Sequence, residues 1–284
     1  MRVVLVYNNA SGGKYTLAKL RQLCRDNNIT ITYSFTVRQL GSPKLAQLVR
    51  RGVIIMAVGG DGTMNSVARL MIDSPSLLLP LPGGTLNHFV RDLGMKGSLE
   101  ELLSHSDKTK ETTIDVGYVN EELFLNNSSL GLYPFTLLDR KRSNPLVTKW
   151  AAALYAGIRQ LIVFRRQSMI IDGVKLRSPF VFVGNNRYNI TSSLIPQRTK
   201  LTAGVLTVIV ASSASRWRLV RAGINVMRGT VSHLDDFTVQ TRKSVVVYTH
   251  ASQLPVSFDG EVKYVSSPFT YSSRPKSLRV LVIK

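Results

Sequence analysis

The sequence predicts an α/β domain built on a parallel sheet, followed by a mainly antiparallel β domain. Apolar runs alternate with helical patterns through the first third of the 284 residues. Continuous apolar strands of this kind are typical of a parallel sheet covered on both faces. After about Thr112 the pattern changes to short strands separated by turn signals, which favours antiparallel pairing. We therefore expect a first domain over residues 1–115 and a second over residues 116–276.

Hydrophobic spacing and capping residues define the expected elements of the first domain. Leu17, Leu20 and Leu23 have helical spacing, while Ser42 and Pro43 are suited to begin a second helix. The sequence predicts strands at 2–8, 29–36, 53–58 and 77–81, and helices at 14–28, 42–52, 63–73 and 86–94.

The second domain is expected to open with a hairpin over residues 112–131 that turns at Asn120 and Glu121. Further strands are predicted at 168–174, 179–186, 204–211, 235–241, 244–249, 255–262 and 277–284. One inserted helix is expected near 145–164, with an apolar stripe and basic residues at both ends. Such a stripe is more often a core face than a membrane-binding face.

Composition limits the classes of protein that this chain can represent. An apolar content of 44% is that of a globular protein. The net charge of +20 favours polyanionic partners, which are nucleic acid, anionic lipid surfaces or phosphate-rich ligands, and does not choose among them. Cys24 is the only cysteine, which excludes an intramolecular disulfide. No run of about 18 uncharged apolar residues predicts a membrane span, and the N-terminus resembles a strand rather than a signal peptide, so a cytoplasmic location is expected.

The stretch Gly59-Gly60-Asp61-Gly62-Thr63 follows an apolar strand and opens a helix. Unpaired backbone N–H groups and the helix dipole favour an anion there, and glycines let a phosphate approach the backbone. Asp61 suits such a site when a divalent cation lies between the carboxylate and the phosphates, which indicates a nucleotide held with Mg²⁺. The alternative is a tight strand-to-helix turn with Thr63 as its cap.

Two further glycine-rich turns, NNASGGK and PGGTLNHF, also follow apolar strands. Ligands of parallel sheets bind at the carboxyl ends of the strands, so we expect the three turns to meet at one edge. Polar residues in these turns that could contact phosphates or a base are Asn9, Ser11, Asn65, Thr85 and Asn87.

The late stretch SFDGEVK contains two carboxylates, Asp259 and Glu261, two residues apart. In an extended segment both would lie on one face, where one could accept a proton and the other could anchor a metal or orient its neighbour. Asp-Gly between alternating residues is also an ordinary hairpin signal, and this alternative stays open.

Together these motifs resemble the diacylglycerol kinase catalytic-domain family, which includes bacterial lipid kinases and the sphingosine and ceramide kinases. The resemblance rests on the motifs NNASGGK, GGDGTMN, PGGTLNHFVRDLG, TIDVGYVNEELFLNNSSLG and VSFDGEV. The resemblance implies an α/β domain like that of NAD kinases and diacylglycerol kinases, a β-sandwich-like second domain, and a final strand, 277–284, that returns to the first. At the positions of His88 and Ala203, many bacterial members of the family have an acidic residue instead.

The resemblance also implies the site. ATP would be bound by Asn9, Ser11, Gly12, Gly13, Thr36, Gly59, Gly60, Asp61, Gly62, Thr63, Asn65, Gly83, Gly84, Thr85 and Asn87. Asp61 would act near Mg²⁺, Glu261 or Asp259 would take the proton of the lipid hydroxyl, and Asp115 would give acidic support.

The expected function is therefore an ATP- and Mg²⁺-dependent lipid kinase acting on a hydroxyl of a lipid such as diacylglycerol. We expect it to be peripheral at the inner, anionic membrane surface, without a nucleic-acid partner; a homodimer stays open. The alternatives are a soluble kinase of a nicotinamide nucleotide and a non-catalytic lipid- or nucleotide-binding protein.

Overall fold

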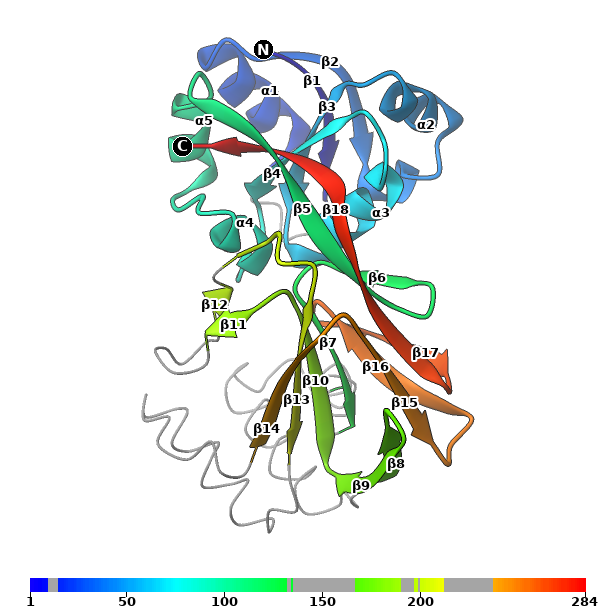
Figure 1. The fold of residues 1–284 in the computed structure, drawn as a ribbon. Coiled ribbons are helices and arrows are strands. Elements are labelled where there is room, and N and C mark those ends of the chain that lie inside the picture. The colour runs from blue at the N-terminus through cyan, green and yellow to red at the C-terminus, as the bar shows by residue number, and fades with distance from the viewer. Residues whose placement is uncertain (10–14, 132–133, 135–166, 190–196, 199, 212–236) are drawn as a thin grey trace, which may run out of the picture. The chain divides into compact units, whose positions relative to one another are not determined.

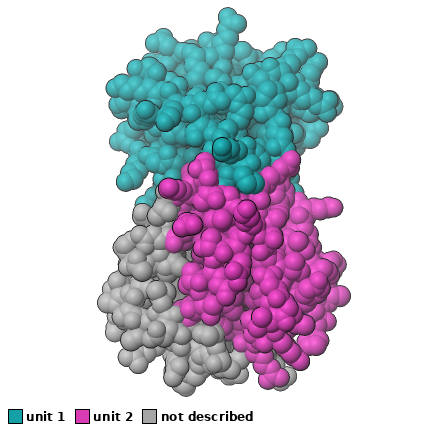
Figure 2. All heavy atoms as spheres, in the orientation of Figure 1, with its two compact units in different colours: residues 1–116, 275–284 teal, residues 117–274 magenta. Residues whose placement is uncertain are grey.

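A computed structural model describes residues 1–9, 15–131, 134, 167–189, 197–198, 200–211 and 237–284 (Figure 1). The helix predicted near 145–164 and the loop residues Ser11, Gly12 and Gly13 lie outside the described residues. The chain forms two compact units, one of Met1–Val116 with Pro275–Lys284 and one of Gly117–Arg274 (Figure 2). Two strands, β5 (Thr109–Val119) and β18 (Phe269–Ile283), each contribute residues to both units.

Unit 1 contains the predicted parallel sheet. Its strands are β1 (Arg2–Tyr7), β2 (Thr30–Thr36), β3 (Ile54–Gly59) and β4 (Leu77–Pro82), in the spatial order β2-β1-β3-β4. All three pairings are parallel, and the last part of β18 continues the sheet as a parallel neighbour of β4 through Val280 and Leu78. The carboxyl ends of β1, β3 and β4 therefore lie at the same edge.

The helices of unit 1 are α1 (Leu17–Asp26), α2 (Pro43–Arg50), α3 (Asp61–Met71), α4 (His88–Asp92) and α5 (Leu99–Ser104), with a short 3₁₀ turn at Val37–Gln39. Pro43 occupies the first turn of α2, as its fixed φ predicts. Helix α5 was not predicted, although Ser98 and Glu101 form a capping box, a pattern that sequence alone can reveal.

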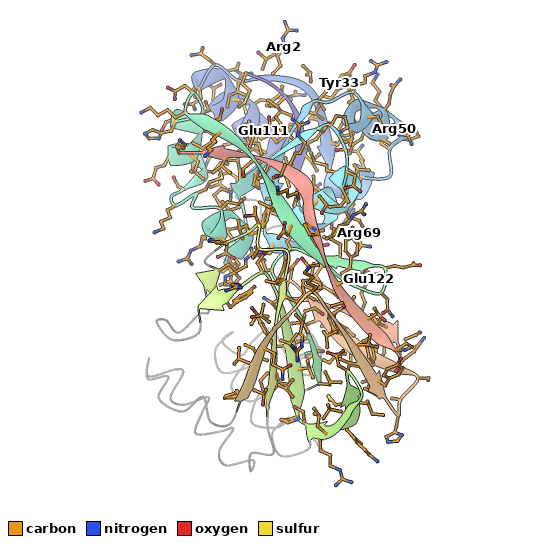
Figure 3. All side chains as sticks on the ribbon, viewed as in Figure 1. Arg2, Tyr33, Arg50, Arg69, Glu111 and Glu122 are labelled. Atoms are coloured by element: carbon orange, nitrogen blue, oxygen red, sulfur yellow. The ribbon has the colours of Figure 1, made fainter. Side chains whose placement is uncertain are left out.

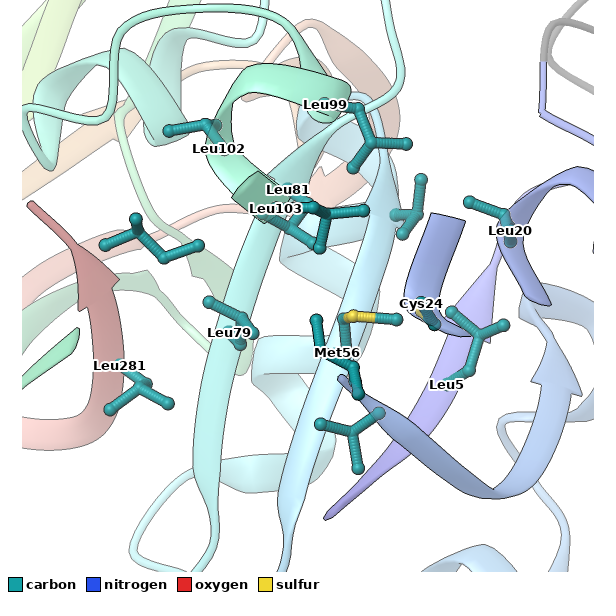
Figure 4. Packing of buried hydrophobic residues seen from close by; sticks show 14 of the residues in the cluster. Leu5, Leu20, Cys24, Met56, Leu79, Leu81, Leu99, Leu102, Leu103 and Leu281 are labelled. Carbon is teal, nitrogen blue, oxygen red and sulfur yellow. The ribbon is translucent and has the colours of Figure 1, made fainter. Parts of the chain in front are cut away.

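Helices and sheet of unit 1 share one apolar core (Figure 4). Leu5 and Met56 from the sheet, Leu20 and Cys24 from α1 and Leu99 from α5 are all buried in it. Cys24 is 1% exposed, and burial raises the pKa of its thiol to about 11.

Cys24 should therefore be chemically inert in the native protein. Only a thiolate attacks a disulfide reagent, and a pKa raised by about 2 units lowers the thiolate fraction about 100-fold near neutral pH. We expect the reaction with an aromatic disulfide to be at least about 100-fold slower in the native chain than in urea. Equal rates in the two states would contradict the burial of Cys24.

Unit 2 is a β-sandwich. One sheet has the order β14-β13-β10-β7-β16-β17 and is antiparallel throughout. Its strands are β7 (Asn127–Gly131), β10 (Phe180–Asn185), β13 (Leu206–Ala211), β14 (Phe237–Arg242), β16 (Gln253–Phe258) and β17 (Glu261–Ser266). These results confirm the predicted fold class.

The other layer of unit 2 consists of the first part of β18, then β15 (Ser244–Thr249), β8 (Gln167–Ile171) and β9 (Val174–Ser178), paired antiparallel. β6 (Glu122–Phe124) pairs with β5, and a two-stranded ladder joins β11 (Tyr188–Asn189) to β12 (Gln197–Arg198). Side chains of both layers form one core, in which Phe124 and Tyr271 meet edge to face.

One predicted strand of unit 2 is wrong. The stretch 168–174 was expected to be continuous, but Asp172 and Gly173 both have positive φ and form the turn between β8 and β9. Asp-Gly favours this hairpin turn because both residues tolerate the left-handed region.

Candidate active site

The glycine-rich turns of unit 1 follow neighbouring strands. Register pairs join Tyr7 to Val58 and Gly59 to Pro82, so β1, β3 and β4 end side by side. The Asn8 backbone N–H donates to the Val58 carbonyl (3.2 Å), and the Asn8 side-chain amide lies 3.5 Å from the Thr63 hydroxyl. The expectation that these turns meet at one edge of the sheet is confirmed for the described residues.

Two of the turns pack backbone against backbone. The Gly83 N–H donates to the Gly59 carbonyl (2.9 Å). A Cβ atom on Gly83 would lie 2.8 Å from the Gly59 nitrogen, and one on Gly84 would lie 2.5 Å from the Gly60 Cα. From the sequence, glycine was expected at these positions because it lets a phosphate approach the backbone. The structure supplies a second reason: only glycine lets the two turns pack this closely. Each turn contributes one Gly-Gly step, Gly59-Gly60 or Gly83-Gly84, and we call these two steps together the glycine pair.

Asp61 ties the same two turns together from the first position of α3. Its Oδ2 accepts the backbone N–H of His88 (3.1 Å), and its Oδ1 accepts that of Phe89 (2.9 Å). These N–H groups belong to the first turn of α4, where a carboxylate is favourable. Asp61 therefore has a structural role that the sequence did not reveal, because its two partners are 27 and 28 residues away.

The turn after β4 is closed by Asn87. This residue has φ of 50°, and its side chain accepts the Gly84 N–H (2.9 Å) and donates to the Gly84 carbonyl (3.0 Å). Both polar atoms of the Asn87 amide group are thus used in holding the turn. Thr85 and Leu86 are left exposed at its tip, with Leu86 58% exposed.

The remaining predicted nucleotide ligands of unit 1 have different surroundings. Thr36 ends β2 beside Tyr7 of β1, and its hydroxyl donates to Gln39 Oε1 (3.1 Å). Thr63 is 4% exposed and lies inside the first turn of α3, whose N-cap is Gly60, so Thr63 is not the cap. Asn9 is exposed after β1, and Asn65 is half-buried on α3.

Asp115, the predicted acidic support, is 1% exposed in β5. Its Oδ1 accepts the Lys276 backbone N–H (2.8 Å), and Lys276 has φ of 50°. The carboxylate thereby stabilises an irregular point of β18 within unit 1.

In unit 2, Asp259 and Gly260 form the turn between β16 and β17, with φ values of 48° and 88°. The hairpin reading is therefore confirmed. The argument that Asp259 and Glu261 share one face of an extended segment is wrong, because Asp259 is in the left-handed region and only Glu261 begins a strand.

The Asp259 carboxylate accepts three consecutive backbone N–H groups. Oδ2 accepts that of Leu125 (2.8 Å), and Oδ1 accepts those of Asn126 (2.7 Å) and Asn127 (3.1 Å). In return the Asp259 N–H donates to the Asn127 carbonyl (3.0 Å). This arrangement makes Asp259 the anchor of the turn, whereas Glu261 is exposed at the start of β17.

Asp259→Asn should destabilise unit 2 by about 1.5–3 kcal/mol, because hydrogen bonds to a charged acceptor would be lost and an amide NH₂ would face backbone donors. Asp172→Asn is the matched control: Asp172 begins another Asp-Gly turn and is exposed, and its carboxylate accepts one backbone N–H, that of Val246, and lies 4.0 Å from Arg242 Nε. Urea unfolding should show the larger loss for Asp259→Asn. Equal losses would remove the anchoring role.

The described residues contain no cluster of three or more His, Cys, Asp or Glu side chains that could hold a metal alone. Mg²⁺ commonly uses only one or two carboxylates together with substrate phosphates. Each Asp61 oxygen accepts one backbone N–H and has a second lone-pair position, so this carboxylate fits such a shared ion.

Unit 1 is thus an α/β unit with a glycine-rich sheet edge, and unit 2 is a β-sandwich with an acidic hairpin turn. The family model of the diacylglycerol kinase catalytic domain matches residues 2–119, and that of the YegS C-terminal NAD kinase beta sandwich-like domain matches residues 139–282. The chain belongs to this diacylglycerol kinase catalytic-domain family.

Individual relatives agree with this family. The chain is 29% identical over 134 residues to "Probable lipid kinase YegS-like" of Enterobacter sp. (strain 638), and the match spans 45% of each chain, less than half the length of that curated relative. It is 25% identical over 219 residues to the diacylglycerol kinase of Bacillus subtilis (strain 168), covering 73% of this chain and 71% of that one.

Solved structures share the fold. A diacylglycerol kinase structure from Bacillus anthracis str. Sterne superposes with a TM-score of 0.69 at 19% identity, covering 98% of this chain and 96% of that chain. A second structure from the same organism gives 0.74 at 21% identity, with the same coverage.

Proposed function

We propose that this chain is an ATP- and Mg²⁺-dependent lipid kinase that transfers the γ-phosphoryl group of ATP to a hydroxyl of a lipid such as diacylglycerol. The observation that carries the proposal is the glycine pair: two Gly-Gly steps, one in each turn, packed together at the carboxyl edge of a parallel sheet, beside the first turn of α3. Such an edge is where ligands of α/β sheets bind, and a helix N-terminus favours phosphate.

In the proposed site, unit 1 binds ATP. Backbone N–H groups of the first turn of α3 would contact the phosphates, while the N–H groups of Gly83 and Gly84 hold the two turns together. Thr85 and Asn9 are exposed and can donate further hydrogen bonds. Mg²⁺ would be held by the phosphates together with Asp61 and would supply positive charge against the triphosphate. By capping α4, Asp61 also keeps the two turns in register.

Unit 2 would supply the base. Glu261 takes the proton of the lipid hydroxyl as its oxygen attacks the γ-phosphorus, and the bond from that phosphorus to the ADP oxygen breaks. ADP leaves, and Glu261 later gives its proton to water. Phosphoryl transfer depends mainly on positioning and charge stabilisation, so a single base is sufficient.

Association with an anionic membrane surface is proposed from charge. The chain carries 37 Lys and Arg against 17 Asp and Glu, and Arg2 and Arg50 extend outward from unit 1 (Figure 3). Basic side chains near an anionic lipid surface each contribute about 1 kcal/mol of attraction. None of the helices in the described part of the chain is long and apolar enough to cross a membrane.

The test is to incubate a total lipid extract with the protein, ATP and Mg²⁺, and to analyse the lipids by mass spectrometry. A parallel reaction contains NAD in place of lipid. The proposal predicts a new phosphorylated lipid and no phosphorylated NAD. Product from NAD alone supports a nucleotide kinase instead, and ATP binding without any product supports a binding protein.

A further inference from the structure

Arg198 is a buried cation in unit 2 that no motif of the sequence indicated. It is 8% exposed, lies in the short strand β12, and pairs across the ladder with Tyr188. Its Nη1 donates to the Leu125 carbonyl (2.6 Å), and its Nη2 donates to Asn126 Oδ1 (2.6 Å). A buried guanidinium is costly unless its donors are satisfied, so its binding to this one segment requires an explanation.

The segment that Arg198 binds is the one that holds Asp259. In the peptide group joining Leu125 and Asn126, the carbonyl accepts from Arg198 while the N–H donates to the Asp259 carboxylate. One peptide group therefore lies between a cation and an anion, with its dipole aligned to both. Alignment of this kind strengthens both hydrogen bonds in a low-dielectric interior.

The next peptide group repeats the arrangement with neutral donors. The Asn126 carbonyl accepts the Tyr188 hydroxyl (2.7 Å) and the Asn185 N–H (2.9 Å), while the Asn127 N–H donates to Asp259. The Asn185 side-chain amide also donates to the Leu125 carbonyl (2.9 Å). The carbonyl groups of Leu125 and Asn126 thus accept from Arg198, Asn185 and Tyr188, and of these three donors only Arg198 is charged.

We propose that Arg198 is a positioning residue for the catalytic turn. It fixes the peptide groups of residues 125–127, these fix the Asp259 carboxylate, and Asp259 sets the turn from which Glu261 begins β17. Arg198 itself touches no substrate in this mechanism. The inference rests on the proposed function only for the role of Glu261; the link from Arg198 to Asp259 stands on the contacts above.

The experiment compares Arg198→Met with Arg198→Lys and with the control Arg177→Met. Methionine keeps much of the length without the charge, and lysine keeps the charge but cannot fork to two acceptors in the same way. Arg177 is an exposed arginine of β9 in the same unit, so its replacement removes the same charge at the surface. Lysine also provides a folded variant if methionine prevents folding.

Amide hydrogen exchange and steady-state kinetics are then measured on the full chain. For Arg198→Met we expect exchange of the 125–127 amides to accelerate at least about tenfold and kcat to fall about 10- to 100-fold, since small misplacements of a reacting group have effects of this size. KM for ATP should stay within about twofold, because ATP is assigned to unit 1. Arg198→Lys should lie between Arg198→Met and wild type, and Arg177→Met should match wild type.

Unchanged exchange at residues 125–127 would overturn the link from Arg198 to Asp259. Accelerated exchange with unchanged kcat would overturn the positioning of Glu261. A wild-type chain that phosphorylates no lipid refutes the proposed function instead, and the exchange measurement, which needs no substrate, still decides whether Arg198 holds the turn.

Discussion

Replacing Glu261 by glutamine should lower kcat for lipid phosphorylation by about 100- to 10,000-fold, which is the usual contribution of a general base. Glutamine has nearly the same shape but cannot take the proton of the attacking hydroxyl. The residue is exposed at the start of β17, and among the described residues no hydrogen bond or ion pair holds its carboxylate. The fold and the affinity for ATP should therefore be unchanged.

Glu121→Gln is the matched control for this experiment. Glu121 is also an exposed glutamate beside a hairpin turn of unit 2, and the mechanism gives it no role. Initial rates at saturating ATP should be near wild type for Glu121→Gln and almost absent for Glu261→Gln. If Glu261→Gln keeps more than about half of the wild-type rate, Glu261 is not the base.

The second large effect is expected from Gly84→Ala. The added Cβ would lie 2.5 Å from the Gly60 Cα, a backbone atom that cannot turn away as a flexible side chain could. Overpacking of this kind typically costs about 1–3 kcal/mol of stability. Because the strain separates the two turns of the glycine pair, the affinity for ATP should fall at least about tenfold in addition.

Gly41→Ala shows what the same chemical change does at a neutral position. Nothing lies within 4 Å of a Cβ on Gly41, and no positive φ is recorded there. Its stability should be equal to wild type or higher by about 0.4–1 kcal/mol, through the unfolded chain. Thermal unfolding measures the stability of each variant, and calorimetric titration with ATP and Mg²⁺ measures its affinity for ATP. Wild-type values of both for Gly84→Ala would mean that the close packing of the turns is unimportant.

The elements of unit 1 were predictable because their signals are local. Alternation of apolar runs with capped helices gave the parallel sheet, and the order of strands and glycine turns along the chain was enough to place the turns at one edge. The capping box at Ser98 and Glu101 is equally local and would have given α5. The turn at Asp172 was not predicted, although it carries the same Asp-Gly signal that indicated a hairpin at Asp259.

What the sequence did not provide are contacts between distant residues. Asp61 was assigned to a metal from its neighbours along the chain, but its partners at the start of α4 become visible only when the two turns meet. Arg198 lies in no motif, and its acceptors Leu125 and Asn126 are 73 and 72 residues away. The division of labour between Asp259 and Glu261 likewise depended on backbone donors more than 130 residues earlier.

The most direct test of the account is a titration of the ¹⁵N-glycine-labelled chain with ATP and Mg²⁺, followed by NMR. The chain has 20 glycines, and two of them provide internal references: Gly52, which precedes β3 at the opposite edge of the sheet, and Gly173, in a turn of unit 2 to which the proposed site gives no role. We predict that the amide signals of the glycine pair and of Gly62 move as ATP binds, while the references stay in place. Saturable ATP binding that leaves the glycine pair unmoved would contradict the central claim.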